Sequence, residues 1–156
     1  MPTLNFRADR EDEGGRNVPA PELLRDRGPI VPVTLMISDS HEQVLAEQGK
    51  PIPTPANGFA LVDTGASRTC FDQAAASAAG LPISDTGFMT SATHARQGVP
   101  IFTGKIIIPQ FGEIHVEKGM GAVLANQGLV ALIGRDLLEN AVLVYNGSAG
   151  FFSISI

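Results

Sequence analysis

Residues 61–67 read LVDTGAS, and this stretch carries the clearest chemical signal in the 156-residue sequence. The apolar run over 59–62 predicts a short strand, and Asp63 follows it directly in a turn that contains Gly65. Two carboxylates held together can share one proton, so that one acts as general base toward a water and the other as general acid. The chain supplies one such turn. We therefore expect a symmetric dimer in which a second copy of the chain provides the other carboxylate.

The composition is typical of one globular domain built mainly from strands. Hydrophobic residues make up 44% of the chain and charged residues 17%, so a chain of this length can bury a core. The 17 glycines and 11 prolines, with no tryptophan and 6% aromatic residues, favour short strands and turns over a helical bundle. The fold class that we expect is therefore mostly β.

The charge and the single cysteine restrict the partners and the compartment. A net charge of -5 gives no basic footprint, so we expect neither nucleic acid nor a membrane surface as a partner. The sequence shows no signal pattern at its start and no apolar run near the roughly 20 residues that span a bilayer. Cys70 is the only cysteine, which excludes an internal disulfide and fits a reducing compartment. We therefore expect a cytoplasmic protein.

The chain divides by pattern into an arm and a domain. Residues 1–28 carry clustered charges and little periodicity, and we interpret them as a flexible N-terminal arm before a domain over 29–156. The stretch 38–57 is a long connection, with a possible helix that begins at a Ser40 cap and then a proline-rich extended spacer. It could modulate access to the site, but we favour the interpretation that it is a tolerated insertion.

The remaining pattern predicts short strands and little helix. Asp72 can cap a short helix over 73–79, because glycine and proline follow that run where a helix should end. Alternating or continuous apolar residues predict the other elements. The predicted strands are 30–37, 103–109, 113–117, 121–124, 129–133, 141–145 and 151–156, with a helical turn over 136–140.

Two motifs lie in the order that is found in a known protein family. Asp63-Thr64-Gly65-Ala66 comes first, and residues 132–138, which read LIGRDLL, follow after a stretch long enough to hold a flap. In this order of motifs the chain resembles the retropepsin-like aspartic proteases, which include retroviral and retrotransposon enzymes and bacterial single-domain relatives. The resemblance spans 29–156. It implies a closed, barrel-like β-fold with one or two short helices, active as a homodimer with a β-hairpin flap over its cleft.

The resemblance also implies roles for the residues of the turn. Asp63 is the implied catalytic residue, and Thr64 is implied to hydrogen-bond across the dimer axis and lock the two turns together. Gly65 is implied to let the substrate backbone approach closely, and Ala66 to line the cleft. Changing Asp63 to Asn would then abolish cleavage, and changing Thr64 to Val would loosen the dimer.

The sequence departs from the retroviral pattern at Ser67, where that branch usually has an aspartate that pairs with the arginine equivalent to Arg135. Three partners stay open for Arg135: Asp136, Asp72 or a carboxylate from the other subunit. Ser67 is expected to offer a hydroxyl hydrogen bond to the substrate backbone. Gly134, Arg135 and Asp136 are together assigned a structural supporting role.

The flap is expected within 86–104, a polar stretch between the helix and the next predicted strand. Ser91, Ala92 and Thr93 fall near its expected tip, and we assign them to substrate binding. The stretch lacks the dense glycine cluster of the retroviral flaps. We therefore do not infer the motion of this flap from that of the retroviral enzymes.

The function implied by the resemblance is hydrolysis of peptide bonds in a peptide or protein substrate. A water between Asp63 and its symmetry mate would attack the bond without a covalent intermediate and without a cofactor. The alternative is a catalytically inactive dimeric domain of the same fold, which would hold an extended peptide by strand addition. The Asp-Thr-Gly triplet favours catalysis, because a domain that only binds has no need of that carboxylate.

Other reactive residue types have simpler explanations. Cys70 lacks the partner spacing of a nucleophile, so a small buried thiol is the favoured role. His41, His94 and His115 are scattered without the spacing of metal ligands, and we expect no metal.

Overall fold

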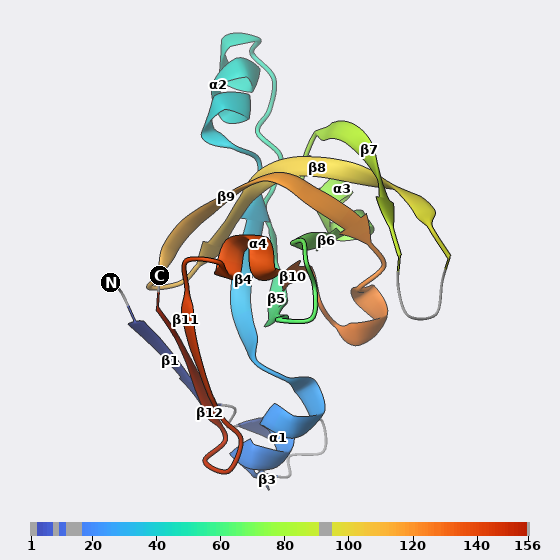
Figure 1. The fold of residues 1–156 in the computed structure, drawn as a ribbon. Helices are drawn as coiled ribbons and strands as arrows, with labels where there is room; N and C mark the ends of the chain where they lie inside the picture. The colour runs from blue at the N-terminus through green and yellow to red at the C-terminus, as the bar shows by residue number, and fades with distance from the viewer. Residues whose placement is uncertain (1–2, 8–9, 12–16, 91–94, 156) are drawn as a thin grey trace.

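The structure, a computed structural model, describes residues 3–7, 10–11, 17–90 and 95–155 (Figure 1). Its main body is a closed barrel of six strands. The ring closes because β8 pairs with β9 on one side and with β4 on the other. The barrel strands follow the order β4 (Ile30–Met36), β5 (Ala56–Val62), β10 (Ala131–Ile133), β6 (Cys70–Asp72), β9 (Gly112–Ala122) and β8 (Gln97–Ile108). A further strand, β7 (Ile83–Met89), pairs with the first half of β8.

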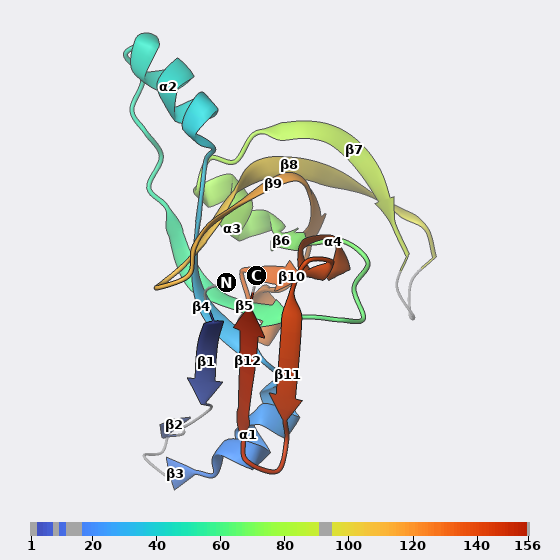
Figure 2. The same ribbon diagram turned by 60° about the vertical axis from the view of Figure 1, so that its left-hand side comes forward.

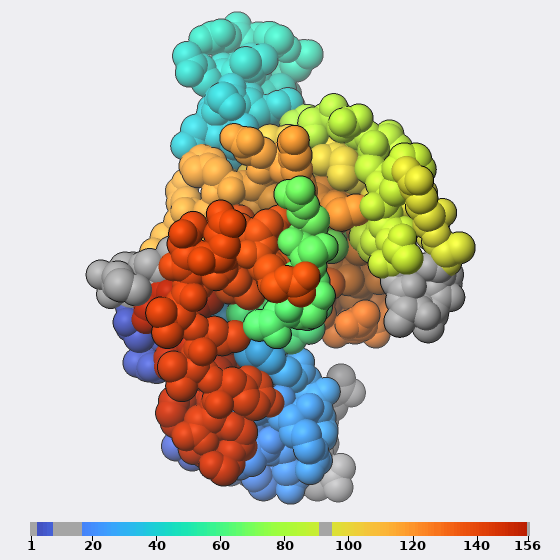
Figure 3. Space-filling model, viewed as in Figure 1, coloured from blue at the N-terminus to red at the C-terminus, as the bar shows by residue number. Residues whose placement is uncertain are grey.

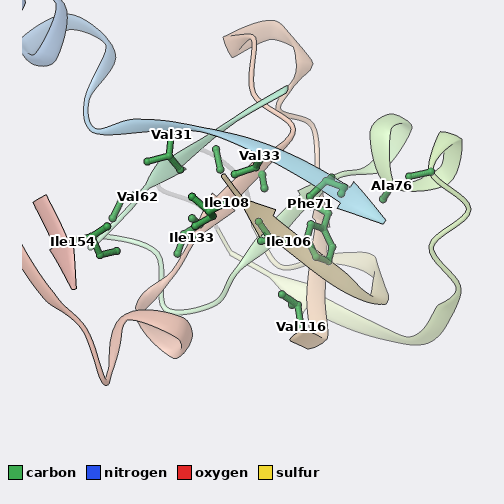
Figure 4. Packing of buried hydrophobic residues seen from close by; sticks show 14 of the residues in the cluster. Val31, Val33, Val62, Phe71, Ala76, Ile106, Ile108, Val116, Ile133 and Ile154 are labelled. Atoms are coloured by element: carbon green, nitrogen blue, oxygen red, sulfur yellow. The ribbon is translucent and has the colours of Figure 1, made fainter. Parts of the chain in front are cut away.

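Alternating residues of the barrel strands fill its interior. In β4, Val31, Val33 and Leu35 are buried, whereas Pro32 between them is exposed and lies opposite Phe59 of β5. This period of two sends every second side chain of a strand to the same face. Figure 4 shows the resulting core, to which β4, β5, β6, β8, β9 and β10 all contribute. The labelled residues are Val31, Val33, Val62, Phe71, Ala76, Ile106, Ile108, Val116, Ile133 and Ile154.

A second sheet of three strands lies beside the barrel. It has the order β1 (Thr3–Arg7), β12 (Phe151–Ser155) and β11 (Val142–Asn146), and all its pairings are antiparallel (Figure 2). Phe152 and Ile154 of the central strand are buried in the same core as the barrel residues. The strands predicted over 141–145 and 151–156 correspond to β11 and β12 and are confirmed.

The amino-terminal segment differs from the expected flexible arm. β1 pairs along its length with β12, and the Phe6 ring stacks on Phe152 with 4.9 Å between centroids. The helix α1 (Ala20–Arg27) buries Leu24 completely, and the Tyr145 hydroxyl donates to the Leu24 carbonyl oxygen over 3.1 Å. These contacts join ends of the chain that are far apart in sequence, so local composition does not reveal them. The division at residue 28 stays a prediction, with regular structure on both sides of it. A short pairing of β2 (Arg10–Glu11) with β3 (Asn17–Val18) completes this region.

The described residues contain four α-helices, more than the one or two that we expected. The helix α2 (Asp39–Glu47) projects from the barrel and buries no residue (Figures 1 and 2). Its cap is Ser38, whose Oγ accepts from the His41 backbone N–H, and not the predicted Ser40. The helix α3 (Gln73–Ala78) begins at Asp72 as predicted. The others are α1 and α4 (Arg135–Leu138), with a 3-10 turn at Ala125–Gln127.

None of the helices in the described ranges has the length and apolar character that a membrane crossing requires.

Candidate active site

Strand pairing places Asp63 at the surface end of a buried strand. β5 runs parallel to β10, with Val62 opposite Ile133, and the Asp63 backbone N–H donates to the Ile133 carbonyl oxygen over 2.9 Å. Val62 and Ile133 are both buried in the core. The barrel therefore fixes the backbone up to Asp63, while the following residues Thr64 and Gly65 are exposed.

The turn itself orients the Asp63 carboxylate. Its Oδ1 accepts the backbone N–H of Gly65 over 2.8 Å and that of Ala66 over 3.3 Å. Backbone donors that hold one oxygen of a carboxylate fix the orientation of its plane. Within the described part of the chain, the second oxygen Oδ2 has no hydrogen-bond partner. The side chain is partly exposed, so this oxygen can receive a water or a substrate group.

Arg135 binds the carbonyl oxygens of the same turn. Its Nη1 donates to the carbonyl oxygens of Thr64, over 2.7 Å, and Gly65, over 3.0 Å. Its backbone N–H donates to the Ala66 carbonyl oxygen over 2.9 Å. Of the partners left open by the sequence, neither Asp136 nor Asp72 is bound. With Ser67 in the place of an aspartate, the guanidinium instead turns to backbone carbonyls.

Asp136 supports the turn through a residue that sequence reasoning missed. Its carboxylate accepts both the backbone N–H and the Oγ1 hydroxyl of Thr69, over 3.0 and 2.8 Å. The same Thr69 hydroxyl oxygen accepts the Gly134 backbone N–H over 3.1 Å. Thr69 is fully buried, so these bonds tie the end of the Asp63 loop to the start of α4 away from water. A lone threonine after a turn gives no sequence signal for such a role.

Gly134 is needed for close packing of two backbones. A Cβ atom at this position would lie 2.4 Å from the Arg68 carbonyl carbon and 2.8 Å from the Thr69 nitrogen. Backbone atoms at such distances cannot move aside as the end of a flexible side chain can. Gly134, Arg135 and Asp136 thus all contact the loop that follows Asp63, and their supporting role stays a prediction.

Cys70 lies just beyond this loop and is not a nucleophile. It is buried, and burial raises the pKa of its thiol to about 11, with the nearby Asp136 and Asp63 carboxylates adding to the effect. The thiol is thus protonated near neutral pH, whereas the reactive form of cysteine is the thiolate. The prediction of a small buried thiol is confirmed.

Two hollows meet the Asp63 turn at the surface. One, of about 610 Å³, is lined by Asp63 and Thr64 together with Leu61, Arg27 and Tyr145 among others. The second lies between Thr64, Arg135 and the apolar side chains that follow α4. In Figure 3 the green segment after β5 is at the surface, between the red carboxyl-terminal segment and the yellow-green strands of the expected flap.

β7 and β8 lie in the part of the chain where the flap is predicted, and the flap itself stays a prediction. β7 pairs with β8 from Ile83 to Met89, and Met89 packs against the buried cluster that contains Cys70 and Leu129. The Arg96 guanidinium lies 4.0 Å from the centre of the Phe88 ring. Ser91, Ala92 and Thr93, which we assigned to substrate binding, lie outside the described residues.

One group of possible metal ligands occurs away from this site. Oxygen and nitrogen atoms of Asp39, Glu113 and His115 lie within 4.8 Å of one another. The buried ammonium of Lys105 already pairs with both carboxylates, at 3.0 Å from Glu113 Oε2. The two ion pairs occupy the carboxylates with this one cation, and the pair with Asp39 ties α2 to the barrel.

The closed six-stranded barrel, with an Asp-Thr-Gly turn at the end of one strand, is the retropepsin-like fold. Residues 56–140 match the protein family described as "gag-polyprotein putative aspartyl protease", and the match covers more than half of the chain. The chain therefore belongs to this aspartyl protease family, and the predicted resemblance is confirmed.

The chain is also similar to a solved structure, described as a retropepsin-like aspartic protease from Rickettsia conorii. The two share 15% sequence identity with a TM-score of 0.47, and the similarity covers 98% of this chain and 91% of the other. No curated protein matches the sequence.

Proposed function

We propose that this protein is an aspartic endopeptidase, active as a homodimer in which each subunit contributes Asp63 to one shared site. The observation that carries the proposal is the Asp63 carboxylate, which backbone groups hold by one oxygen at the surface end of a buried strand. Membership of an aspartyl protease family supports the same reaction. One chain holds one such turn, so a second copy is required for a pair of carboxylates.

The proposed reaction needs only water and the two carboxyl groups. The ionised Asp63 takes a proton from a water held between the pair, and the water oxygen attacks the peptide carbonyl carbon. The protonated Asp63 of the other subunit gives its proton to the carbonyl oxygen, which forms a tetrahedral diol. Transfer of a proton to the amide nitrogen then lets the carbon–nitrogen bond break, leaving a free acid and a free amine. No covalent intermediate or cofactor takes part.

Apolar side chains beside Thr64 support a second subunit at this face. Leu138, Ala141 and Leu143 line the hollow that also contains Thr64 and Arg135. Val142 and Val144 of the neighbouring β11 are 57% and 49% exposed. Contiguous exposed apolar surface is typical of a protein interface. A second chain that covers this surface would bring its own Thr64 and Asp63 to the same place.

The substrate in this proposal is a peptide or protein in extended conformation. The hollow beside Asp63 offers a place where such a segment would lie. The cytoplasm stays the predicted location, because Cys70 gives no reason for an oxidising compartment.

The experiment compares wild type with Asp63→Asn on a mixed peptide library, read by mass spectrometry from mildly acidic to neutral pH. Wild type should cleave the peptides, and the cleavage rate of Asp63→Asn should be lower by at least about 1000-fold, because an amide cannot take a proton from water. Glu47→Gln makes the same carboxylate-to-amide change on the exposed helix α2 and should cleave as wild type does. Turnover by Asp63→Asn at the wild-type rate would exclude the proposal. Two folded, dimeric but inactive proteins would favour the alternative of a peptide-binding domain.

A further inference from the structure

The hollow beside Asp63 continues into a second one of about 550 Å³. The two share Asp26, Arg27, Leu61 and Gln127 in their linings, so they form one groove that leads away from the catalytic turn. Each of the two hollows by itself is within the range of volumes found for ligand sites. A peptide cut at Asp63 would therefore pass along this groove on one side of the scissile bond.

The floor of the groove is apolar. Ile30, Phe59 and Leu61 are partly buried there and pack against the cluster of buried residues that contains Leu129. Partly buried side chains of this kind lose further contact with water when an apolar ligand covers them, which favours binding. The floor thus fits a large apolar side chain of the substrate.

The groove is lined by the Arg27 guanidinium, for which the described residues provide no carboxylate partner. Asp26 is already paired, because its Oδ1 accepts from Arg25 Nε over 2.8 Å, and this bond holds the pKa of Asp26 below its ordinary value. Arg27 lines both parts of the groove, and within the described residues it makes no ion pair or side-chain hydrogen bond. The groove therefore combines an apolar floor with the positive charge of Arg27.

We propose that Arg27 selects substrates that carry an acidic side chain beside a large apolar one, on the side of the scissile bond that occupies this groove. This inference rests on the proposed function. A guanidinium presents two parallel N–H donors to a carboxylate, a match that an uncharged amide of the same shape cannot reproduce. Charge complementarity thus identifies the occupant as an acidic and apolar peptide segment.

The test uses pairs of peptides that differ only by Asp or Asn, with the pair placed at each position around the cleaved bond. At one position wild type should prefer Asp by about fivefold to tenfold in kcat/KM, the size expected of a partly exposed ion pair. Arg27→Glu should lose this preference or favour a Lys peptide instead. Lys50→Glu, which makes the same charge change outside the groove, should keep the wild-type preference.

Two outcomes of the cleavage experiment would overturn the inference. One is cleavage by wild type with no preference for Asp at any position. The other is a preference that survives in Arg27→Glu while the dimer dissociation constant rises, which would assign Arg27 to the subunit interface. Binding of the same peptides to Asp63→Asn, measured by fluorescence anisotropy, gives a readout without turnover. Tighter binding of the Asp peptide would support the inference even if no peptide is cut, and equal binding of both peptides would contradict it.

Discussion

Arg135 fixes the Asp63 turn through backbone oxygens and not through a carboxylate. The two carbonyl groups that it binds belong to Thr64 and Gly65, so the guanidinium sets the path of the backbone directly after Asp63. The Gly65 peptide N–H in turn holds Asp63 Oδ1. A charged donor to a carbonyl group is stronger than a neutral one. At the scale of single residues, Arg135 is therefore a positioning residue for Asp63.

We predict that Arg135→Ala lowers kcat by about 10-fold to 100-fold, the range that corresponds to 1.5–3 kcal/mol for a hydrogen bond to a charged group. KM should change much less, because Arg135 acts on the orientation of Asp63. Arg135→Lys should restore part of the rate, since an ammonium can still reach one of the two carbonyl oxygens. Steady-state kinetics of the three proteins check this.

Melting temperatures and dimer dissociation constants are the controls for this prediction, because a loss of fold or of dimer would also lower the rate. Lys50→Ala removes a surface cation outside the site and should leave kcat as in wild type. If Arg135→Ala raised KM alone and left kcat unchanged, Arg135 would contact the substrate, and its assigned role would be wrong.

At the scale of elements, Asp72 connects α3 with the chain that follows β9. Its Oδ2 accepts the Ala75 backbone N–H over 3.0 Å, and its Oδ1 accepts those of Leu124 and Ala125 over 2.8 and 3.0 Å. The residue is 4% exposed. Burial by itself would raise the pKa of Asp72, but the backbone donors outweigh burial and hold this pKa below its ordinary value. The carboxylate therefore stabilises the folded state in its charged form.

We predict that Asp72→Asn lowers the free energy of unfolding by about 1–3 kcal/mol at neutral pH, because an amide cannot accept all these N–H groups. A lowered folded pKa gives stability that is present above the unfolded value, about 3.9, and is lost as pH falls through the folded value. The difference in unfolding free energy between wild type and Asp72→Asn should therefore become smaller below about pH 4. Urea denaturation at several pH values measures it.

Asp85→Asn is the matched control for this variant, because Asp85 is exposed and, among the described residues, accepts a hydrogen bond only from the N–H of its neighbour Thr86. It should change the unfolding free energy little. A constant difference between wild type and Asp72→Asn from pH 7 to pH 2 would contradict the assigned role of the charge.

Elements with local signals could be predicted from the sequence, and those held by distant contacts could not. The pattern of α3 with its Asp72 cap and the alternation of β12 are local, and both were predicted correctly. β1 exists because residues 3–7 pair with residues 151–155 at the other end of the chain, and nothing in residues 3–7 announces that partner. The cap of α2 was misplaced because Ser38 and Ser40 are equally good caps by residue type.

The candidate site likewise contains residues with a local sequence signal and residues whose roles depend on distant contacts. Asp63 was predicted because a strand and a turn mark it in one stretch of sequence. Thr69 and Arg27 were missed, because their roles depend on which segments the barrel brings together. The partner of Arg135 was left open, since a guanidinium can bind carbonyl groups that any residue provides.

At the scale of the whole molecule, the closed barrel presents the Asp63 turn at one face. β5 ends at that face, and β11 with its exposed valines lies next to it. Each chain thus offers one carboxylate beside an apolar surface. The proposed reaction requires that this surface meets its own copy, because one carboxyl group cannot act as acid and base in the same step.

Activity of mixtures of wild type and Asp63→Asn tests this central claim most directly. The two proteins are mixed in varied ratios at constant total concentration, and cleavage is measured after the subunits have exchanged. A site shared by two chains is inactive in mixed dimers, so activity should follow the square of the wild-type fraction, about one quarter at equal amounts. A linear decrease, with about one half of the activity left at equal amounts, would show that each chain holds a complete site and would contradict the account.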